Sequence, residues 1–384
     1  MIQQFKTSHF IYGLIFLFLL SLPLYAESDF VVAIMPDGLS GSALLHVGIL
    51  IFMFAYLSSS WNILGGFAGQ LSLGHAAFFG IGAYTSSLIY VHTGVSPWIG
   101  MLVGSAIAAV VGYGLGFISF KYGLKGPFFA LVTIAFAEIL RLLFLYFEFT
   151  GGPLGLLIPL SSEYTFWEYQ FLEKEPYYYI ALGLMVFGIV VCGIVSSSKF
   201  GYYLRAIRES EEAAEALGIH SMYNKMHAVA LSGAMTALGG TFYAQYTQYI
   251  VPDDVIKIAL SIEIILFAVI GGSGLVMGPI IGTFLLVPIG EMSRVIFEGG
   301  GVERSLAEYS AHHLKSDIKF SQAVPSKLIE RTRYEVASLA VITSRYSVSG
   351  EYNGREVDLT MNETVTVSNT TESGWKIIRI HWSN

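Results

Sequence analysis

The sequence is long, apolar and poor in charged residues. Its 384 residues are 54% hydrophobic and 13% charged, with a mean hydropathy of +0.61, whereas a soluble domain carries about 25% charged residues. A net charge of −7, with no basic patch interleaved with aromatic residues, argues against nucleic acid as a partner. The single cysteine, Cys192, excludes a disulfide framework and a cysteine-based metal site. The composition is that of a polytopic membrane protein.

Apolar runs of membrane-spanning length follow one another up to Phe297. A helix needs about 20 apolar residues to cross the bilayer core. The expected spans are residues 9–26, 43–64, 71–91, 97–120, 127–147, 176–196, 226–249, 257–274 and 275–297. The first run ends like a cleaved signal peptide, but the runs behind it favour an uncleaved span. We therefore expect an all-α polytopic fold with about 8–10 transmembrane helices.

A change in composition near Phe297 predicts a second domain. Residues 298–384 hold 10 of the 21 Lys and Arg and 11 of the 28 Asp and Glu. Residues 326–384 read as alternating strands, with turn signals at Gly350, Asn353-Gly354 and Ser373-Gly374. We expect a transmembrane domain over 1–297 and a soluble tail over 298–384 that forms an α+β, strand-rich partial domain.

A polar segment, Lys199 to Lys225, interrupts the apolar runs. Charges within Arg205 to Leu217 recur at spacings of three and four, which is typical of a helix. The expected pairs are Arg205 with Glu209, and Arg208 with Glu211 and Glu212. The small or apolar contact positions are Ala206, Ala213, Ala214 and Leu217. Gly218 is placed to end this helix. The segment is either a docking helix for a soluble partner or a plain solvated loop.

Loop charge predicts the side on which this segment lies. If every run crosses once, Lys6, the loop with Lys121 and Lys125, and the polar segment fall on one side. The other side receives residues 28–41 and the acid-rich residues 148–175. Because basic loops mark the cytoplasm, the polar segment is expected to face the cytoplasm, where a soluble partner can reach it.

Residues 61–84 are a candidate part of a translocation pathway. They are dense in glycine and carry Gln70, Ser72 and His75. Such glycine density fits helices that touch or break around a cavity. A histidine on an apolar helix is more often an interhelical hydrogen-bond partner than a ligand site. Both interpretations of His75 stay open.

Charged residues inside the spans add further pathway candidates, because such charges face the protein interior or water. Glu138 lies three residues from Arg141, and a self-compensating pair is the default expectation there. Glu263 has no local partner. Residues 271–282 are either a tight turn between two spans or a broken helix near a pathway.

Four motifs in order resemble the permease subunits of bacterial branched-chain amino acid ABC importers, of the LivM type. The motifs are WNILGGFAGQLSLGHAAFFGIGAYTSS (61–87), GPFFALVTIAFAEILRLL (126–143), FGYYLRAIRESEEAAEALGI (200–219) and SIEIILFAVIGGSGLVMGPIIGTFLL (261–286). The resemblance covers about residues 43–297. It implies a multi-pass inner-membrane protein that pairs with a second permease subunit, two cytoplasmic ATPase subunits and a periplasmic substrate-binding protein.

The resemblance also implies a division of chemistry. ATP and Mg²⁺ would bind the partner subunits, and this chain would bind no cofactor and carry no catalysis of its own. Residues 200–219 match the cytoplasmic helix that engages the ATPase in this family. The coupling residues implied are Gly201, Arg205, Ala206, Arg208, Glu209, Ala213, Ala214, Leu217 and Gly218. No Ser-His-Asp arrangement, zinc spacing or nucleotide loop occurs in residues 1–297, which also favours a transport subunit over an enzyme.

The chain departs from this family after Phe297. The tail resembles the C-terminal part of SnoaL-like, nuclear transport factor 2-like domains, without their initial helices and first strand. A chimeric or misjoined reading frame therefore stays an alternative. Three other functions stay open as well: a urea or short-amide importer permease, a membrane-anchored SnoaL-like binding or enzyme module, and secondary transport without an ATPase, in which Glu263 would be the residue to test.

Overall fold

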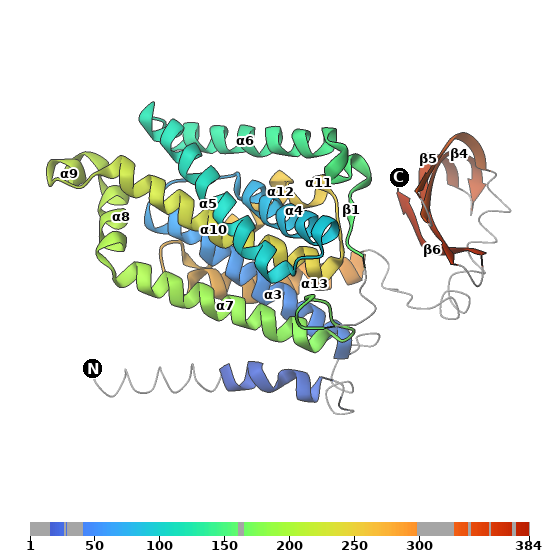
Figure 1. The fold of residues 1–384 in the computed structure, drawn as a ribbon, viewed down its shortest axis with the longest axis horizontal. Helices are drawn as coiled ribbons and strands as arrows, with labels where there is room; N and C mark the ends of the chain where they lie inside the picture. The colour runs from blue at the N-terminus through green and yellow to red at the C-terminus, as the bar shows by residue number, and fades with distance from the viewer. Residues whose placement is uncertain are drawn as a thin grey trace. The chain divides into compact units, whose positions relative to one another are not determined.

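The protein is described here by a computed structural model, which covers residues 16–26, 28, 41–159, 165–297, 326–336, 339–352, 355–370 and 374–383. The chain divides into two units, Met1–Gly299 and Gly300–Asn384. The first unit is a bundle of long helices and the second holds an antiparallel sheet (Figure 1).

Every predicted apolar run contains a helix. The first run holds a short helix, Phe16–Tyr25. The others hold α3 (Gly41–Asn62), α4 (His75–Thr93), α5 (Pro97–Lys121), α6 (Pro127–Tyr146), α7 (Lys174–Ser197), α10 (Ser221–Thr247), α12 (Ile258–Gly272) and α13 (Gly278–Phe297). Shorter elements connect them: the π-helix η1 (Ile63–Phe67), the 3₁₀ turns η2 (Glu148–Thr150) and η3 (Gly152–Leu154), α8 (Lys199–Glu209), α9 (Glu211–Ala216) and α11 (Pro252–Val255).

Five helical segments of the described chain are long and apolar enough to cross a membrane, fewer than the 8–10 expected. They are Gly41–Phe67, Pro97–Lys121, Pro127–Tyr146, Lys174–Ser197 and Pro252–Gly272. The helices α4 and α10 have 19 and 27 residues but are richer in small and polar side chains. Those side chains meet neighbouring helices, as when Thr241 Oγ1 donates to the carbonyl oxygen of Gly82 at 3.0 Å. Burial inside the bundle therefore replaces contact with lipid for α4 and α10.

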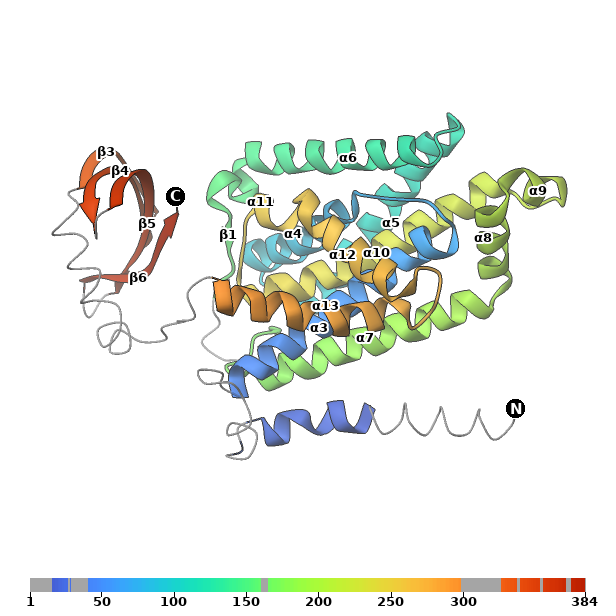
Figure 2. The same ribbon diagram turned by 180° about the vertical axis from the view of Figure 1, so that it is seen from behind.

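The bundle consists of two groups of helices. In one, which we call the α3 group, α3 packs against α7, α12 and α13; in the other, the α10 group, α10 packs against α4 and α5. The helix α6 lies along the outer side of the α10 group (Figures 1 and 2). The central helices α3 and α10 join the groups, and Tyr56 Oη donates to the carbonyl oxygen of Met235 at 2.8 Å.

The two ends of the bundle differ in their connections. One end carries α11 and the pairing of β1 (Leu156–Leu157) with β2 (Tyr249–Ile250). The opposite end carries α8 and α9, as both ribbon views show (Figures 1 and 2). Lys125 and Lys225 both contact Glu211 there, so the basic loops gather at one end, as the predicted topology requires. By the rule that basic loops stay inside, we expect this end to face the cytoplasm.

The second unit contains one four-stranded antiparallel sheet in the order β3-β4-β5-β6. Its strands are β3 (Ser326–Val336), β4 (Leu339–Tyr352), β5 (Arg355–Thr370) and β6 (Gly374–Ser383). Strands fill the described part of residues 326–384, as predicted, but residues 333–352, expected to form one strand, hold the end of β3 and all of β4. Gly350 is not a turn, since it lies in β4 and pairs with Val357. The pairing of Tyr352 with Arg355 brackets the predicted Asn353-Gly354 turn, which lies outside the described residues.

Candidate functional site: a charged helical segment at the basic end of the bundle

The polar segment forms two helices, where the sequence predicted one. The helix α8 ends at Glu209 and α9 begins at Glu211. Ser210 between them is extended (φ −159°, ψ 108°), and its Oγ accepts a hydrogen bond from Ala213 N at 3.3 Å. A serine in this conformation is a strong N-cap, so it starts a new helix where the charge pattern suggests continuity. The prediction of one helix over Arg205–Leu217 is therefore wrong.

Both ends of this α8–α9 segment, residues 198–219, are capped. Ser198 Oγ accepts a hydrogen bond from Gly201 N at 3.2 Å and starts α8. At the other end Gly218 has φ +83°, donates to Glu215 O at 2.9 Å, and is followed by a bond from Ile219 N to Ala214 O at 3.0 Å. These two bonds form a Schellman motif, which confirms Gly218 as the residue that ends the helix.

Arg208 joins the α8–α9 segment to the α3 group. Its Nη1 donates to the carbonyl oxygen of Gly66 in η1 at 2.8 Å, and its Nη2 contacts Glu209 at 3.0 Å. The stem of Arg208 lies against Gly69, where an added Cβ would stand 2.6 Å from the arginine Cγ. Gly69 also has φ +65°. The glycine-dense run thus lets an arginine approach the end of α3, a role that its sequence did not predict.

The remaining predicted pairs of the α8–α9 segment are not the ones observed. Arg205 donates to the carbonyl oxygen of Ser196 and stacks over the ring of Tyr202, instead of pairing with Glu209. Glu211 pairs with lysines outside the segment instead of with Arg208. The two expected pairs of Arg208 with α9 failed because the helix breaks at Ser210 between the partners. The pair of Arg205 with Glu209 lies within α8, but Glu209 contacts Arg208 instead.

The predicted small and apolar contact positions divide by exposure. Leu217 is 83% exposed, Ala213 is exposed, and Ala206 is half-buried. Ala214 is 2% exposed and points into the bundle, so it does not offer a surface to a partner. Gly201 is buried, and an added Cβ there would overlap the carbonyl oxygen of Val195. The surface available to a soluble partner therefore centres on Leu217 and the exposed charges.

Glu211 forms a second attachment, which sequence reasoning missed. It lies 2.5 Å from Lys225 Nζ on α10 and 3.2 Å from Lys125 Nζ in the α5–α6 connection. Lys225 is 2% exposed, and its ammonium also lies 4.5 Å from the centre of the Phe120 ring. A lysine at the start of an apolar run was the available signal, because a buried ammonium requires an acidic partner.

The environment of this cluster shifts two pKa values. Burial acts to raise the pKa of Glu211, but hydrogen bonds from Lys225 and Lys125 outweigh it, and the net pKa is lowered. The hydrogen bond to Glu211 raises the pKa of Lys125. Glu211 is therefore ionised at neutral pH, and the contact weakens only as the pH falls below the ordinary glutamate pKa of about 4.3 or rises above the ordinary lysine pKa of about 10.4.

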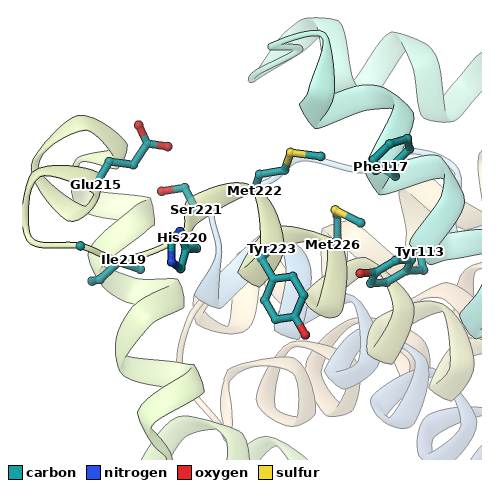
Figure 3. Close-up of a pocket in the computed structure, with 10 residues that line it drawn as sticks. Tyr113, Phe117, Glu215, Ile219, His220, Ser221, Met222, Tyr223 and Met226 are labelled. Carbon is teal, nitrogen blue, oxygen red and sulfur yellow. The ribbon is translucent and has the colours of Figure 1, made fainter.

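An open groove lies beside α9, with a volume of about 920 Å³. Figure 3 shows Tyr113 and Phe117 of α5 on one side and Tyr223 and Met226 of α10 on the other. The α9–α10 connection, including His220, closes its end. The groove shows that α9 stands clear of α5 and leaves its outer face accessible.

Ser72 and His75 are joined in the interior of the bundle. His75 is fully buried, and its Nδ1 lies 3.1 Å from Ser72 Oγ and its Nε2 2.7 Å from Ser232 Oγ. Ser232 Oγ donates its proton to Ser60 O at 2.7 Å. His75 Nε2 must therefore donate to Ser232, and Nδ1 accepts from Ser72. His75 is an interhelical hydrogen-bond partner with both ring nitrogens used.

The connection before α4 folds back on α3. Trp61 Nε1 donates to Ser72 O at 2.9 Å. After η1 the connection therefore runs back along α3 by about two turns before α4 begins. The helices thus break at the glycine-dense run, one of the two arrangements expected from it. Gln70 lies in this connection and is 8% exposed. Its Nε2 donates to Ala68 O at 3.1 Å, while its Oε1 has no partner among the described residues.

Asn62 settles the interpretation of residues 271–282. Its Oδ1 accepts from Gly274 N at 2.8 Å and its Nδ2 donates to Leu275 O at 2.9 Å. These bonds hold a turn between α12 and α13 against the end of α3, beside Arg208. The tight-turn interpretation is confirmed, and the turn lies at the basic end of the bundle.

The acidic pathway candidates lie apart from His75. Glu138 pairs with Arg141, with Oε2 2.9 Å from Nε, and Arg141 also pairs with Asp253 of α11. The expected self-compensating pair is thus present and extended to a third residue. Glu263 is half-buried on α12, and within the described part of the chain no hydrogen bond or ion pair reaches its carboxylate.

Closely packed apolar helices with a charged, capped helical segment at one end are the architecture of a polytopic membrane protein. Residues 43–303 match the family "Branched-chain amino acid transport system / permease component", and the chain belongs to this family. It is a multi-pass protein of the inner, or plasma, membrane.

Two curated relatives are similar over part of their length. The high-affinity branched-chain amino acid transport system permease protein LivM of Escherichia coli (strain K12) is 29% identical over 65% of this chain and 63% of that protein. The nucleoside ABC transporter permease protein NupC of Lactococcus lactis is 23% identical over 46% of this chain and 59% of that protein. The chain thus spans less than two thirds of the relatives it matches.

One solved structure also matches. A ketosteroid isomerase from Shewanella frigidimarina is 34% identical and covers 22% of this chain and 68% of that chain, with a TM-score of 0.21. A TM-score this low carries no structural argument. The SnoaL-like character of residues 298–384 stays a prediction.

Proposed function

We propose that the chain is the permease subunit of an ATP-binding cassette importer for branched-chain amino acids. It pairs with a second permease, receives substrate from a periplasmic binding protein, and is driven by two cytoplasmic ATPase subunits that hold ATP and Mg²⁺. The α8–α9 segment carries this proposal, because it is a charged surface at the basic end that is joined to the helices of the bundle.

The contacts of the α8–α9 segment support coupling. Arg208 reaches the end of α3 and lies beside the α12–α13 turn, while Leu217, Glu212 and Glu215 are exposed. A soluble subunit bound to the outer face can therefore displace helices that it does not touch. A plain solvated loop needs neither the buried contacts nor the caps at both ends.

Family membership and the relative from Escherichia coli support the substrate class. Leucine, isoleucine and valine are the substrates to test first, with a nucleoside and urea as competitors. Gln70 and Glu263 are the polar groups that we assign to the pathway, since each has a side-chain oxygen without a partner in the described part of the chain.

Co-purification with the products of neighbouring genes tests the proposal. We expect the affinity-tagged protein to carry a second permease and two copies of ATPase, and the complex to hydrolyse ATP faster when a leucine-loaded binding protein is added. Stimulation by a nucleoside or urea, but not by leucine, would replace the substrate assignment. A chain that purifies without any ATPase, and transports with a proton or sodium gradient, would contradict the proposal.

A further inference from the structure

Besides the packing of α8 against α7 and α10, two polar contacts attach the α8–α9 segment to the bundle, and each contact joins it to a different group of helices. Arg208 on α8 contacts Gly66 at the end of α3. Glu211 on α9 contacts Lys225 on α10 and Lys125 before α6. The extended residue Ser210 lies between the two attachments.

The Glu211 attachment places charged groups in a buried site, where polar contacts cost free energy. Lys225 is almost fully buried, and Phe120 and Glu211 are its neighbours. A buried ion pair seldom adds net stability over apolar side chains of similar size. The Glu211–Lys225 pair is suited to holding two elements together, because a short, charge-assisted contact fixes the distance between them and resists being pulled apart.

Other charges near the cluster do not replace this contact. Glu212 and Glu215 lie on the same short helix but are exposed. Lys125 is also exposed, with 57% of its side chain accessible, whereas the side chain of Lys225 is 3% exposed. Of these charges, Glu211 and Lys225 therefore form the one pair shielded from water, and salt screens such a pair least.

We propose that Glu211 and Lys225 form a strut that transmits displacement of α9 to the α10 group, separately from the Arg208 contact that transmits displacement of α8 to the α3 group. This inference rests on the proposed function, because it assigns the route by which the ATPase moves the helices. Ser210, the extended residue between α8 and α9, separates the two routes. The strut makes Glu211 and Lys225 positioning residues for transport.

Substitution of Glu211 in the complete importer tests the strut. Glu211→Gln keeps the size of the side chain but removes the charge that holds Lys225. We expect the number of leucine molecules imported per ATP hydrolysed to fall about fivefold or more, with the ATPase still bound and still active. Glu148→Gln, which neutralises an exposed acid of η2 outside the α8–α9 segment, is the control and keeps the wild-type ratio.

Two further variants keep the test decisive if Glu211→Gln folds poorly. Lys225→Gln should reduce the import-to-hydrolysis ratio to the same degree, and the Glu211→Gln/Lys225→Gln double variant should be no worse than either single variant, since all three remove one interaction. Lys125→Gln changes an exposed partner, so it should fold normally and reduce the ratio less.

The outcomes separate the strut from the proposed function. A coupled wild-type importer with an unchanged ratio in Glu211→Gln overturns the strut and leaves the proposed function standing. Additive losses in the double variant overturn it too, because they show that the two residues act independently. A wild-type complex that holds no ATPase contradicts the proposed function and the strut together.

Discussion

His75 shows how a polar residue inside a membrane protein can serve the fold. Its two ring nitrogens join the connection before α4 to α10, and Ser232 carries the chain of bonds on to α3. Three segments that are distant in sequence are therefore held by one imidazole. Its partners Ser72 and Ser232 would each lose a buried hydrogen bond if the ring were removed.

Replacement of His75 should lower stability more than it alters transport. His75→Ala leaves two buried hydroxyls without that partner, at a cost of about 1–3 kcal/mol in the free energy of unfolding. We expect a lower thermal unfolding midpoint in detergent, with leucine uptake retained at low temperature. Ser87→Ala is the matched control, because Ser87 is buried but bonds only to Ala83 O of its own helix. Lost uptake at an unchanged midpoint would instead place His75 in the pathway.

Residue-level predictions from sequence succeeded for one local pair, whereas Arg205 and Glu209 share α8 and do not pair in the described structure. The Glu138–Arg141 pair is three residues apart and forms as expected. The Arg208–Gly66 and Glu211–Lys225 contacts join residues 142 and 14 positions apart, and spacing along one helix cannot reveal them. Side-chain pairing across elements depends on packing, which the sequence specifies only through the whole fold.

At the scale of elements, the α8–α9 segment owes its shape to its ends. Ser198, Ser210 and Gly218 fix where each helix starts and stops. Because α9 has only six residues, it cannot be stable alone, and its caps and tertiary contacts must hold it. A change in one cap should therefore move the outer face of α9 without unfolding the bundle.

Substitutions at Gly218 test this dependence on the cap. An added Cβ meets nothing within 4 Å, so the cost comes only from φ +83°. Gly218→Val should cost about 1–2 kcal/mol locally and reduce the leucine imported per ATP. Gly218→Asn, which tolerates the left-handed conformation, should stay close to wild type. Equal transport by the two variants would show that the position of α9 is not important for coupling.

The positions of the long helices were predictable from sequence, but the breaks between helices were less so. Apolar runs of about 20 residues located the long helices, and Gly218 marked a real helix end. The break at Ser210 was missed because the charge spacing across it predicts one continuous helix, although serine itself favours the N-cap position. Gly350 was read as a turn but lies within a strand, since its paired neighbours override its propensity.

At the scale of the whole molecule, two units of different composition share one chain. The family match ends at residue 303, and the division between the units falls after Gly299. Charge density alone placed the boundary near Phe297. The helical unit contains every element that the proposed transport uses. The proposed transport function assigns no role to the sheet of the second unit.

The central claim is that ATP hydrolysis drives transport through the α8–α9 segment, and leucine uptake by the importer reconstituted in vesicles tests it most directly. With ATP on the cytoplasmic side, the wild type should accumulate leucine, and Arg208→Ala should retain its ATPase but lose most uptake, because Gly66 O loses its charged donor. Glu148→Gln, in η2 outside the α8–α9 segment, should match the wild type. Uptake by Arg208→Ala at the wild-type rate, or wild-type uptake that needs an ion gradient instead of ATP, would contradict the account.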